Sequence, residues 1–282
     1  MGISAGDVKR LREKTGAGMM ECKNALVETG GDFDQAEKRL KEKGLAAVEK
    51  RMDRATNEGK VFITIRDRTA VLVELASETD FVARNPEFIA LGGLLADRIL
   101  DQGYTEPNEE LRGLVTDLAT KIRENMSLRR IQVVHAGDNE YLTQYIHGDG
   151  NIGVIVKLRA DKPEVFQQEG VRDFAFSIAL HVAAFNPLAL DRTKIQGDFL
   201  KEQEAIFRKQ LEGDEKLAGK PPAVLDQILK GKLTKYLSDV CLLDQGYVKE
   251  EKLSVAQALA NCGKQAGADL QIVEYLYFKV GA

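Results

Sequence analysis

Apolar residues in the first fifty positions recur every three or four residues and are interrupted by glycine-rich breaks. This spacing is typical of amphipathic helices, and the glycines are typical of helix ends. The pattern predicts helices over three segments, at residues 4–15, 19–29 and 32–44. Gly44 is the expected C-cap of the third helix. Residues 1–54 should therefore form a compact three-helix module, which is followed by a linker.

From about residue 60 the pattern changes to runs rich in β-branched residues. The runs 61–65 and 70–75 flank a polar turn and predict a β-hairpin. Asn85-Pro86 then opens a helix, because a capping amide precedes a proline at the first turn. This order of hairpin and helix predicts an α+β subdomain over residues 55–140.

The same order of elements recurs in the second half of the chain. Runs at 141–146 and 152–158 predict a second hairpin. A helix with one apolar face follows, formed by Val171, Phe174, Ile178, Val182 and Phe185. The repeat predicts a second, related α+β subdomain over residues 141–282.

Two further segments complete this second subdomain. Helical segments on both sides of a glycine- and proline-rich turn predict an antiparallel helical hairpin at about 192–240 that projects from the core. The apolar run 272–280 predicts a last strand in the second sheet. The fold class is therefore α+β, with an N-terminal three-helix module, two repeated α+β subdomains and a helical hairpin.

The composition is that of an ordinary globular protein, with 44% apolar residues, 30% charged residues and a net charge of −4. A direct nucleic-acid partner is not expected, because nucleic-acid-binding domains are usually strongly basic. Three scattered cysteines without a CxxC pair argue against a disulfide framework and a zinc site. The longest uncharged run, residues 174–190, is shorter than a membrane span. Without a signal-peptide pattern, the protein is expected in the cytoplasm and not on a membrane.

No motif for catalysis stands out. Residues 148–153 match G-x-G-x-x-G, but a strand is expected after them, so a hairpin turn explains them better than a nucleotide site. In residues 213–221 the Gly-Lys spacing is one residue too long for a phosphate loop. His181, on an apolar helix, is more typical of a core residue than of a ligand. We therefore expect no catalytic residue, no metal and no cofactor.

Two short segments are candidates for contact with a partner. In residues 77–86, either Phe81 packs into the core, or the loop presents Phe81 outward beside the carboxylate of Asp80. In residues 15–20, the adjacent Met19 and Met20 cannot both face one small core. Either one of them is an exposed apolar contact, or both pack against the linker. The residues alone leave both choices open.

These two segments also carry a resemblance to a known family. The stretch 11–23, Leu-Arg-Glu-Lys-Thr-Gly-Ala-Gly-Met-Met-Glu-Cys-Lys, followed downstream by Thr79-Asp80-Phe81-Val82, resembles the elongation factor Ts family. The similarity continues through Arg123-Glu124-Asn125 and Gly219-Lys220-Pro221 and covers essentially the whole chain. The family usually has a glycine where this chain has Arg123.

The resemblance implies a ubiquitin-associated-like module and a partner, the GTPase EF-Tu in its GDP-bound and nucleotide-free forms. It implies that the protein is an exchange factor, not an enzyme with covalent chemistry, which releases GDP from EF-Tu so that GTP can bind. Asp80 and Phe81 would enter near the Mg²⁺ site of EF-Tu, while Thr79 and Val82 hold the loop. Further contacts with EF-Tu would come from Leu11, Arg12, Met19, Met20, Ile122 and His147. A homodimer or a two-to-two complex stays open.

Two other functions remain as alternatives. The helical module alone could bind peptides or ubiquitin-like partners, which would leave Phe81 without a role. A nucleotide-binding enzyme would instead use residues 148–153. Binding by the isolated module, or of nucleotide to the isolated chain, would separate these alternatives from an exchange factor.

Overall fold

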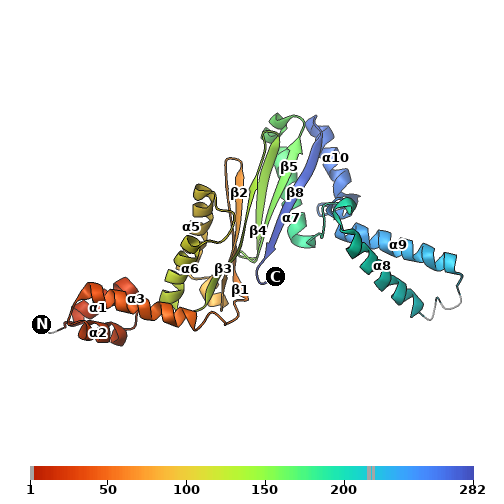
Figure 1. Ribbon diagram of the computed structural model, residues 1–282. Coiled ribbons are helices and arrows are strands. Elements are labelled where there is room, and N and C mark those ends of the chain that lie inside the picture. The colour runs from red at the N-terminus through yellow and green to blue at the C-terminus, as the bar shows by residue number, and fades with distance from the viewer. Residues whose placement is uncertain (1–2, 215–216, 218–219) are drawn as a thin grey trace. The chain divides into compact units, whose positions relative to one another are not determined.

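The computed structural model describes residues 3–214, 217 and 220–282, which divide into two compact units. The first unit holds the chain up to residue 135 together with 146–153 and 278–282, and the second holds 136–145 and 154–277. Both units combine helices with strands (Figure 1), so the expected α+β class is confirmed. The predicted domain boundaries near residues 54 and 140 stay predictions.

The N-terminal helices of the first unit are α1 (Ala5–Thr15), α2 (Met19–Glu28) and α3 (Phe33–Glu49). Ser4 and Asp7 form a capping box at the start of α1, and Gly16 ends it in the left-handed conformation. One apolar cluster holds the three helices together, formed by Val8, Leu11, Cys22, Ala25, Leu26, Ala36 and Leu40. The three-helix module is therefore confirmed as a structure with its own small core.

The prediction that Gly44 ends the third helix is wrong, because α3 continues to Glu49. The glycine serves a close approach to α6 (Glu109–Ile122). A Cβ atom at Gly44 would lie 2.3 Å from Cγ2 of Thr120 in α6, well inside van der Waals contact. A contact far away in the sequence therefore explains a glycine that local pattern assigns to a helix end.

The sheet of the first unit has the order β1 (Glu58–Arg66), β2 (Thr69–Ser77), β3 (Met126–His135), with antiparallel neighbours. The predicted first hairpin is confirmed as β1–β2. Helix α5 (Pro86–Gln102) packs on β1 and β2, and α6 packs on β3. Asn85 caps α5 with Pro86 at its first turn, as predicted. The core between helices and sheet fixes the end of β2, where the candidate loop begins.

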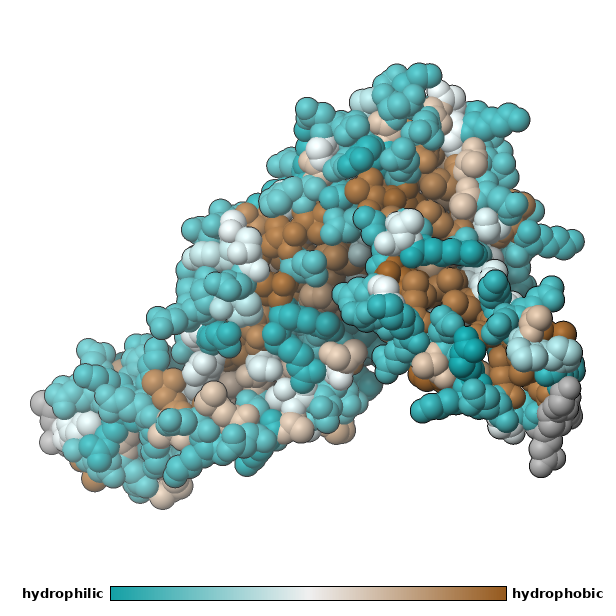
Figure 2. Space-filling view, turned by 45° about the vertical axis from the view of Figure 1, so that its right-hand side comes forward, coloured by the Kyte–Doolittle hydropathy of each residue, from teal (hydrophilic) through white to brown (hydrophobic). Residues whose placement is uncertain are grey.

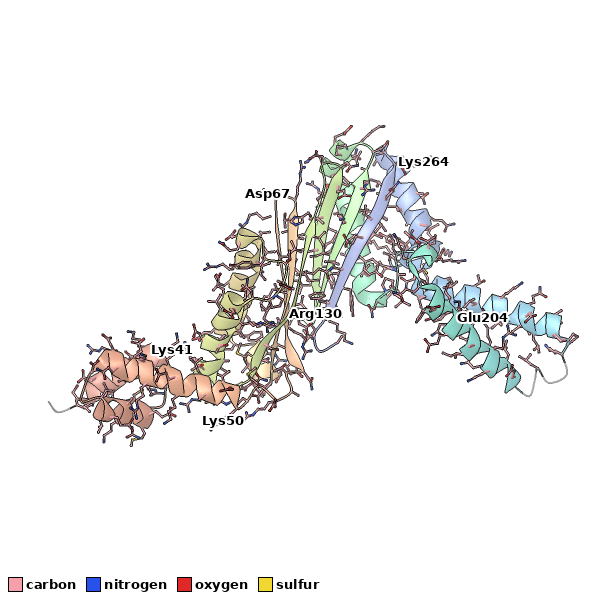
Figure 3. All side chains as sticks on the ribbon, viewed as in Figure 1. Lys41, Lys50, Asp67, Arg130, Glu204 and Lys264 are labelled. Carbon is pink, nitrogen blue, oxygen red and sulfur yellow. The ribbon has the colours of Figure 1, made fainter. Side chains whose placement is uncertain are left out.

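Strand β3 has no counterpart among the predicted elements. Its sequence carries Arg129 and Arg130, two charged residues on an edge strand of this sheet. The fully buried carboxylate of Glu74 in β2 pairs with both, at 3.4 Å and 2.6 Å (Arg130 is labelled in Figure 3). The two arginines of β3 thus supply the partners that this buried carboxylate needs.

The second sheet has the order β4 (Glu140–His147), β5 (Ile152–Ala160), β8 (Leu270–Lys279). The predicted second hairpin strands and the last strand are thereby confirmed. A two-stranded ribbon joins β6 (Gly246–Tyr247) to β7 (Glu250–Ser254), and α10 (Val255–Ala266) follows it. Short 3-10 helices lie at Pro163–Gln167 (η1), Arg192–Lys194 (η2) and Leu242–Asp244 (η4).

Helix α7 (Glu169–Phe185) carries the predicted apolar face, of which all but the last residue is buried. Phe185 is exposed at the last position of the helix, which Asn186 ends in the left-handed conformation. His181 is fully buried and makes two hydrogen bonds: Nε2 donates to Oε1 of Gln245 at 2.9 Å, and the Val248 N–H donates to Nδ1 at 3.2 Å. The interpretation of His181 as a satisfied core residue is confirmed.

The predicted helical hairpin consists of α8 (Gly197–Glu212) and α9 (Pro222–Val240). Phe199 near the start of α8 stacks on Tyr236 near the end of α9, with ring centroids 6.5 Å apart. Arg208 pairs with Asp226 at 3.6 Å. These contacts make the two helices antiparallel neighbours. The predicted turn between them, including Gly219, lies partly outside the described residues.

Candidate functional site

The candidate loop folds as a single helical turn, α4 (Asp80–Ala83), between β2 and α5. Thr79 is its N-cap and accepts a hydrogen bond at Oγ1 from the Val82 N–H, at 3.4 Å. The Thr79 carbonyl also accepts from the Ala83 N–H at 3.3 Å. Hydroxyl capping of this kind satisfies amide groups that a short helix otherwise leaves unpaired.

The side chains of this turn point in different directions, one toward solvent and the next two toward the core. Phe81 is 81% exposed, whereas Val82 and Ala83 belong to the buried core beneath the sheet helices. The interpretation in which Phe81 packs into the core is therefore wrong. A ring this exposed costs free energy in water and gains it when covered by a partner.

Hydrogen bonds and an ion pair hold the start of the loop in place. The Thr79 hydroxyl donates to both carboxylate oxygens of Glu124, at 3.0 Å each. Glu78 accepts from the Asn125 N–H at 2.6 Å and pairs with Arg54 at 3.3 Å. Bonds to a carboxylate are among the stronger hydrogen bonds in proteins. Phe81 is therefore mounted on a rigid base.

Asp80 stands at the first position of α4 and is about half exposed. Its carboxylate lies 3.3 Å from the guanidinium of Arg84 on the next turn. An exposed pair of this kind contributes little stability and exchanges easily with other charges. The loop therefore presents an aromatic ring and a carboxylate as neighbours on one surface.

Three of the predicted contacts in the helical module are exposed, and one is not. Met19 and Met20 are 46% and 64% exposed, and Arg12 is also on the surface. Figure 2 shows the visible face of this module as mostly hydrophilic, with a few hydrophobic residues. Leu11 is fully buried in the module core, so a contact through its side chain does not fit the structure. It holds α1 against the other two helices instead.

The two remaining predicted contacts are Ile122 and His147. Ile122 is half-buried against the core and precedes Glu124, the residue that holds Thr79, by two positions. His147 is exposed at the end of β4. The neighbouring Asp149 has a lowered pKa, because Lys60 bonds to its carboxylate and Arg84 adds a favourable charge. Asp149, two residues after His147, thus lies within electrostatic range of Arg84, which directly follows α4.

The sequence pattern missed the residues that hold the loop, Glu78, Glu124 and Asn125. Only the family resemblance points to Glu124 and Asn125. A local signal for them is absent, because each acts on a segment far away in the chain. Local sequence pattern therefore located the exposed residues Asp80 and Phe81 but not the residues that hold their loop.

Residues 148–153 form the turn between β4 and the start of β5. Asn151 N–H donates to the Gly148 carbonyl at 3.2 Å, which closes a turn, and β5 follows directly. A Cβ at Gly153 would lie 2.4 Å from Cγ1 of Val61, so this glycine serves close strand packing. The interpretation of this segment as a hairpin turn is confirmed.

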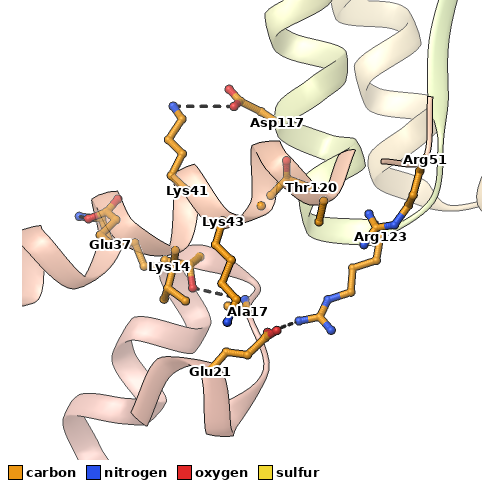
Figure 4. A pocket seen from close by; sticks show the side chains of 14 residues that line it. Lys14, Ala17, Glu21, Glu37, Lys41, Lys43, Arg51, Asp117, Thr120 and Arg123 are labelled. Atoms are coloured by element: carbon orange, nitrogen blue, oxygen red, sulfur yellow. Dashed lines mark hydrogen bonds and ion pairs between the residues drawn. The ribbon is translucent and has the colours of Figure 1, made fainter. Parts of the chain in front are cut away.

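Within the described residues, no group of three or more His, Cys, Asp or Glu side chains is placed to hold a metal ion. In the same part of the chain, no helix is both long and apolar enough to cross a bilayer. A pocket of about 300 Å³ lies between α3 and α6 and is lined mainly by charged side chains (Figure 4). Among its charges, Lys14 pairs with Glu37, and Arg123 pairs with Glu21.

Comparison with known proteins agrees with the resemblance. The family model described as "Elongation factor TS" matches residues 78–282. An elongation factor Ts of Treponema denticola is 48% identical over 281 residues, covering 100% of this chain and 99% of the relative. The elongation factors Ts of Treponema pallidum (strain Nichols) and Borreliella burgdorferi (strain ZS7) are 44% and 40% identical, and the matches cover 99% or more of every chain. The chain therefore belongs to the elongation factor Ts family.

Proposed function

We propose that this protein is a translation elongation factor that catalyses release of GDP from EF-Tu and so allows GTP to bind. Membership of the family supports the partner. The observation that carries the mechanism is the 81% exposed ring of Phe81 on a clamped helical turn. The protein would act in the cytoplasm with EF-Tu in its GDP-bound and nucleotide-free forms, and without covalent chemistry of its own.

In this mechanism Phe81 enters between side chains of the GTPase domain of EF-Tu, near its Mg²⁺ site. Mg²⁺ bridges phosphate oxygens and protein ligands, so displacing the groups that hold it removes a large electrostatic attraction for GDP. The carboxylate of Asp80 would add a negative charge of this protein near the phosphates of GDP. Thr79 and Val82 would keep the conformation of the loop fixed, so that Phe81 displaces groups of EF-Tu instead of being displaced itself.

The exchange reaction is a coupling between two binding events. If this protein weakens GDP binding by some factor, GDP weakens binding of this protein by the same factor. A tenfold effect needs only about 1.4 kcal/mol. Covering an exposed phenylalanine contributes about 1.5–3 kcal/mol toward this coupling.

The other exposed residues would bind EF-Tu without disturbing its nucleotide. Met19 and Met20 offer flexible apolar contacts, and Arg12 adds a charge on the same module. Ile122 and His147 would add contacts around the loop. This division predicts that the module contributes to affinity, whereas the loop determines the rate of release.

The test is release of fluorescently labelled GDP from the EF-Tu–GDP–Mg²⁺ complex. Wild type should accelerate release, and Phe81→Ala should lower the maximal rate by about 10- to 100-fold, in line with the free energy of covering the ring. Phe176→Ala is the matched control, because it removes a ring that is 44% exposed elsewhere in the chain. Equal rates for wild type and Phe81→Ala would reject the mechanism.

A further inference from the structure

Three consecutive residues after α6 hold three different segments of the first unit. Arg123 bonds to Glu21 of α2. Glu124 accepts from the Thr79 hydroxyl under the Phe81 loop. The side-chain amide of Asn125 donates to the carbonyls of Met52 and Arg54, at 3.2 Å and 2.8 Å. We call residues 123–125 the clasp.

Arg123 occupies a backbone conformation that disfavours its side chain. Its φ is 68°, in the left-handed region where glycine is preferred, and its N–H caps α6 by donating to the Ala119 carbonyl at 2.8 Å. A glycine would cap α6 with less strain. An arginine kept at such a position suggests that its side chain has a use.

The partner of Arg123 is itself held in place. The Glu21 carboxylate accepts from the Gly18 N–H at 2.8 Å at the start of α2. That bond and the bond from Arg123 both lower the pKa of Glu21, so the carboxylate stays charged. Figure 4 shows Arg123 reaching from the end of α6 to Glu21 beside the pocket. The pair therefore links the first turn of α2, which carries Met19 and Met20, to the end of α6.

The Arg123–Glu21 pair affects the orientation of the helical module more than the free energy of unfolding. The side chains of Arg123 and Glu21 are 50% and 39% exposed, and exposed ion pairs contribute little to unfolding free energy. The close packing of Gly44 on Thr120 and the pair between Lys41 and Asp117, at 3.8 Å, already seat α3 on α6. Because α2 packs on α3 in the module core, the Arg123–Glu21 pair adds a second attachment of the module to the end of α6 and opposes rocking of the whole module on that seat.

We propose that the clasp is a positioning device that holds the methionine-bearing α2 and the Phe81 loop in one fixed arrangement. Arg123 sets the module, Glu124 sets the loop, and Asn125 fixes the linker between them. The inference rests on the proposed exchange function for its consequence, because the two surfaces then engage EF-Tu together instead of in two steps. Preorganisation of this kind lowers the entropy lost on binding.

The clasp is tested first in the free full-length protein, without EF-Tu. Nitrogen-15 relaxation reports whether the amides of residues 5–49 tumble with those of the first sheet. Wild type should show one common correlation time. Arg123→Gly and Glu21→Gln should both shorten that of the helical module, and the double variant should add nothing further. Arg123→Lys, which keeps the charge, should retain most of the common tumbling.

The second readout is labelled GDP release at increasing concentrations of the factor. Arg123→Gly should raise the half-saturating concentration about two- to fivefold at an unchanged maximal rate, which is the range of an exposed ion pair. Glu124→Ala should lower the maximal rate, and Glu124→Gln should restore most of it by keeping an acceptor for Thr79. A purely structural cap at Arg123 predicts an unchanged half-saturating concentration and a higher midpoint of unfolding.

The outcomes separate the clasp from the proposed function. Common tumbling in Arg123→Gly together with an unchanged half-saturating concentration would overturn the clasp while leaving the exchange function in place. Failure of wild type to accelerate GDP release would reject the exchange function, and the relaxation data would still decide whether the clasp orders the module.

Discussion

Both halves of the chain join a strand to a long helix through a short helical turn, but the two turns place their aromatic residues differently. Between β2 and α5, α4 leaves Phe81 81% exposed. Between β5 and α7, η1 buries Phe166, whose ring stacks on Tyr141 with centroids 5.4 Å apart. The same order of elements therefore supports an outward ring and an inward ring.

The two turns are also held by different forces. Turn α4 is capped by the Thr79 hydroxyl, whereas Lys162 at the start of η1 makes no side-chain capping bond. The first turn is held by polar bonds and by the burial of Val82 and Ala83, and the second by the packing of Phe166. Because Val82 and Ala83 supply the apolar contacts of the first turn, Phe81 stays available to a partner. The exposure of Phe81 is a property of this loop and does not follow from the repeated architecture.

The largest expected difference between the two turns is in stability. Phe166→Ala removes a buried, stacked ring and should lower the free energy of unfolding by about 3–5 kcal/mol. Phe81→Ala removes a ring that contacts little and should change the same quantity by no more than about 0.5 kcal/mol. Urea unfolding followed by circular dichroism measures both. A loss of several kcal/mol in Phe81→Ala would show that the ring supports its own fold.

His181 in the second half of the chain is also buried, and its burial makes the folding stability of the protein sensitive to acid. Burial lowers the pKa of His181, and the Gln245 bond opposes this only in part. Below the ordinary pKa of about 6.5 the unfolded chain binds a proton that the native state resists, so stability falls with pH until the lowered pKa is reached. The loss within that window is at most about 1.4 kcal/mol per pH unit. Above it, His181 contributes no pH dependence.

Two measurements check this prediction. Titration of the imidazole Cε1–H shift by NMR should place the His181 midpoint below about 6.5. The urea concentration at the midpoint of unfolding of the wild type should decrease when the pH is lowered from 7.5 to 5. A His181 midpoint at or above the ordinary value would contradict the burial of a neutral imidazole.

The comparison also shows how far sequence reasoning reaches. The hairpin of β1 and β2 and the helix opened by Asn85 were predictable, because alternation and capping are local properties. Strand β3 was not, because two arginines interrupt its apolar pattern and their buried partner, Glu74 of β2, lies far away in the chain. Local patterns omit the long-range pairing that makes such a strand stable.

The candidate site shows the same limit. The residues that present the loop, Asp80 and Phe81, were identifiable from a distinctive segment, but whether the ring points in or out depends on which neighbour fills the core. Val82 and Ala83 fill it, which leaves Phe81 outside. The supports at Glu78 and Glu124 act across about 45 residues of chain. Periodicity carries no information at that distance.

Gly44 offers a smaller test, which separates the stability of a helix from its seating. Gly44→Ala should favour α3 by about 1 kcal/mol through helix propensity. The added Cβ, 2.3 Å from Cγ2 of Thr120, should oppose the seating of α3 on α6 by about 1–3 kcal/mol. We expect a net loss of about 1 kcal/mol in the interaction between module and α6, measured as faster hydrogen exchange along their contact.

Thr120→Ser is the matched rescue for Gly44→Ala. Serine lacks the Cγ2 atom but keeps the hydroxyl that donates to the Thr116 carbonyl at 2.9 Å. The double variant should return to wild-type exchange at the contact and keep the gain in helix propensity. Persistence of fast exchange in the double variant would show that Gly44 has a role other than close approach.

The smallest expected effect concerns the polar cap that distinguishes α4 from η1. Thr79→Val keeps the shape of the side chain but removes the hydroxyl that accepts from Val82 and donates to Glu124. The loss should be about 1 kcal/mol, the usual contribution of an N-cap, and should loosen α4 without unfolding the sheet. The maximal rate of GDP release should then fall about fivefold, because 1 kcal/mol corresponds to that factor. Thr79→Ser keeps the hydroxyl and should release GDP at nearly the wild-type rate. If Thr79→Val exchanged as fast as Thr79→Ser, stiffness of the turn would be irrelevant, and exposure of Phe81 alone would account for its action.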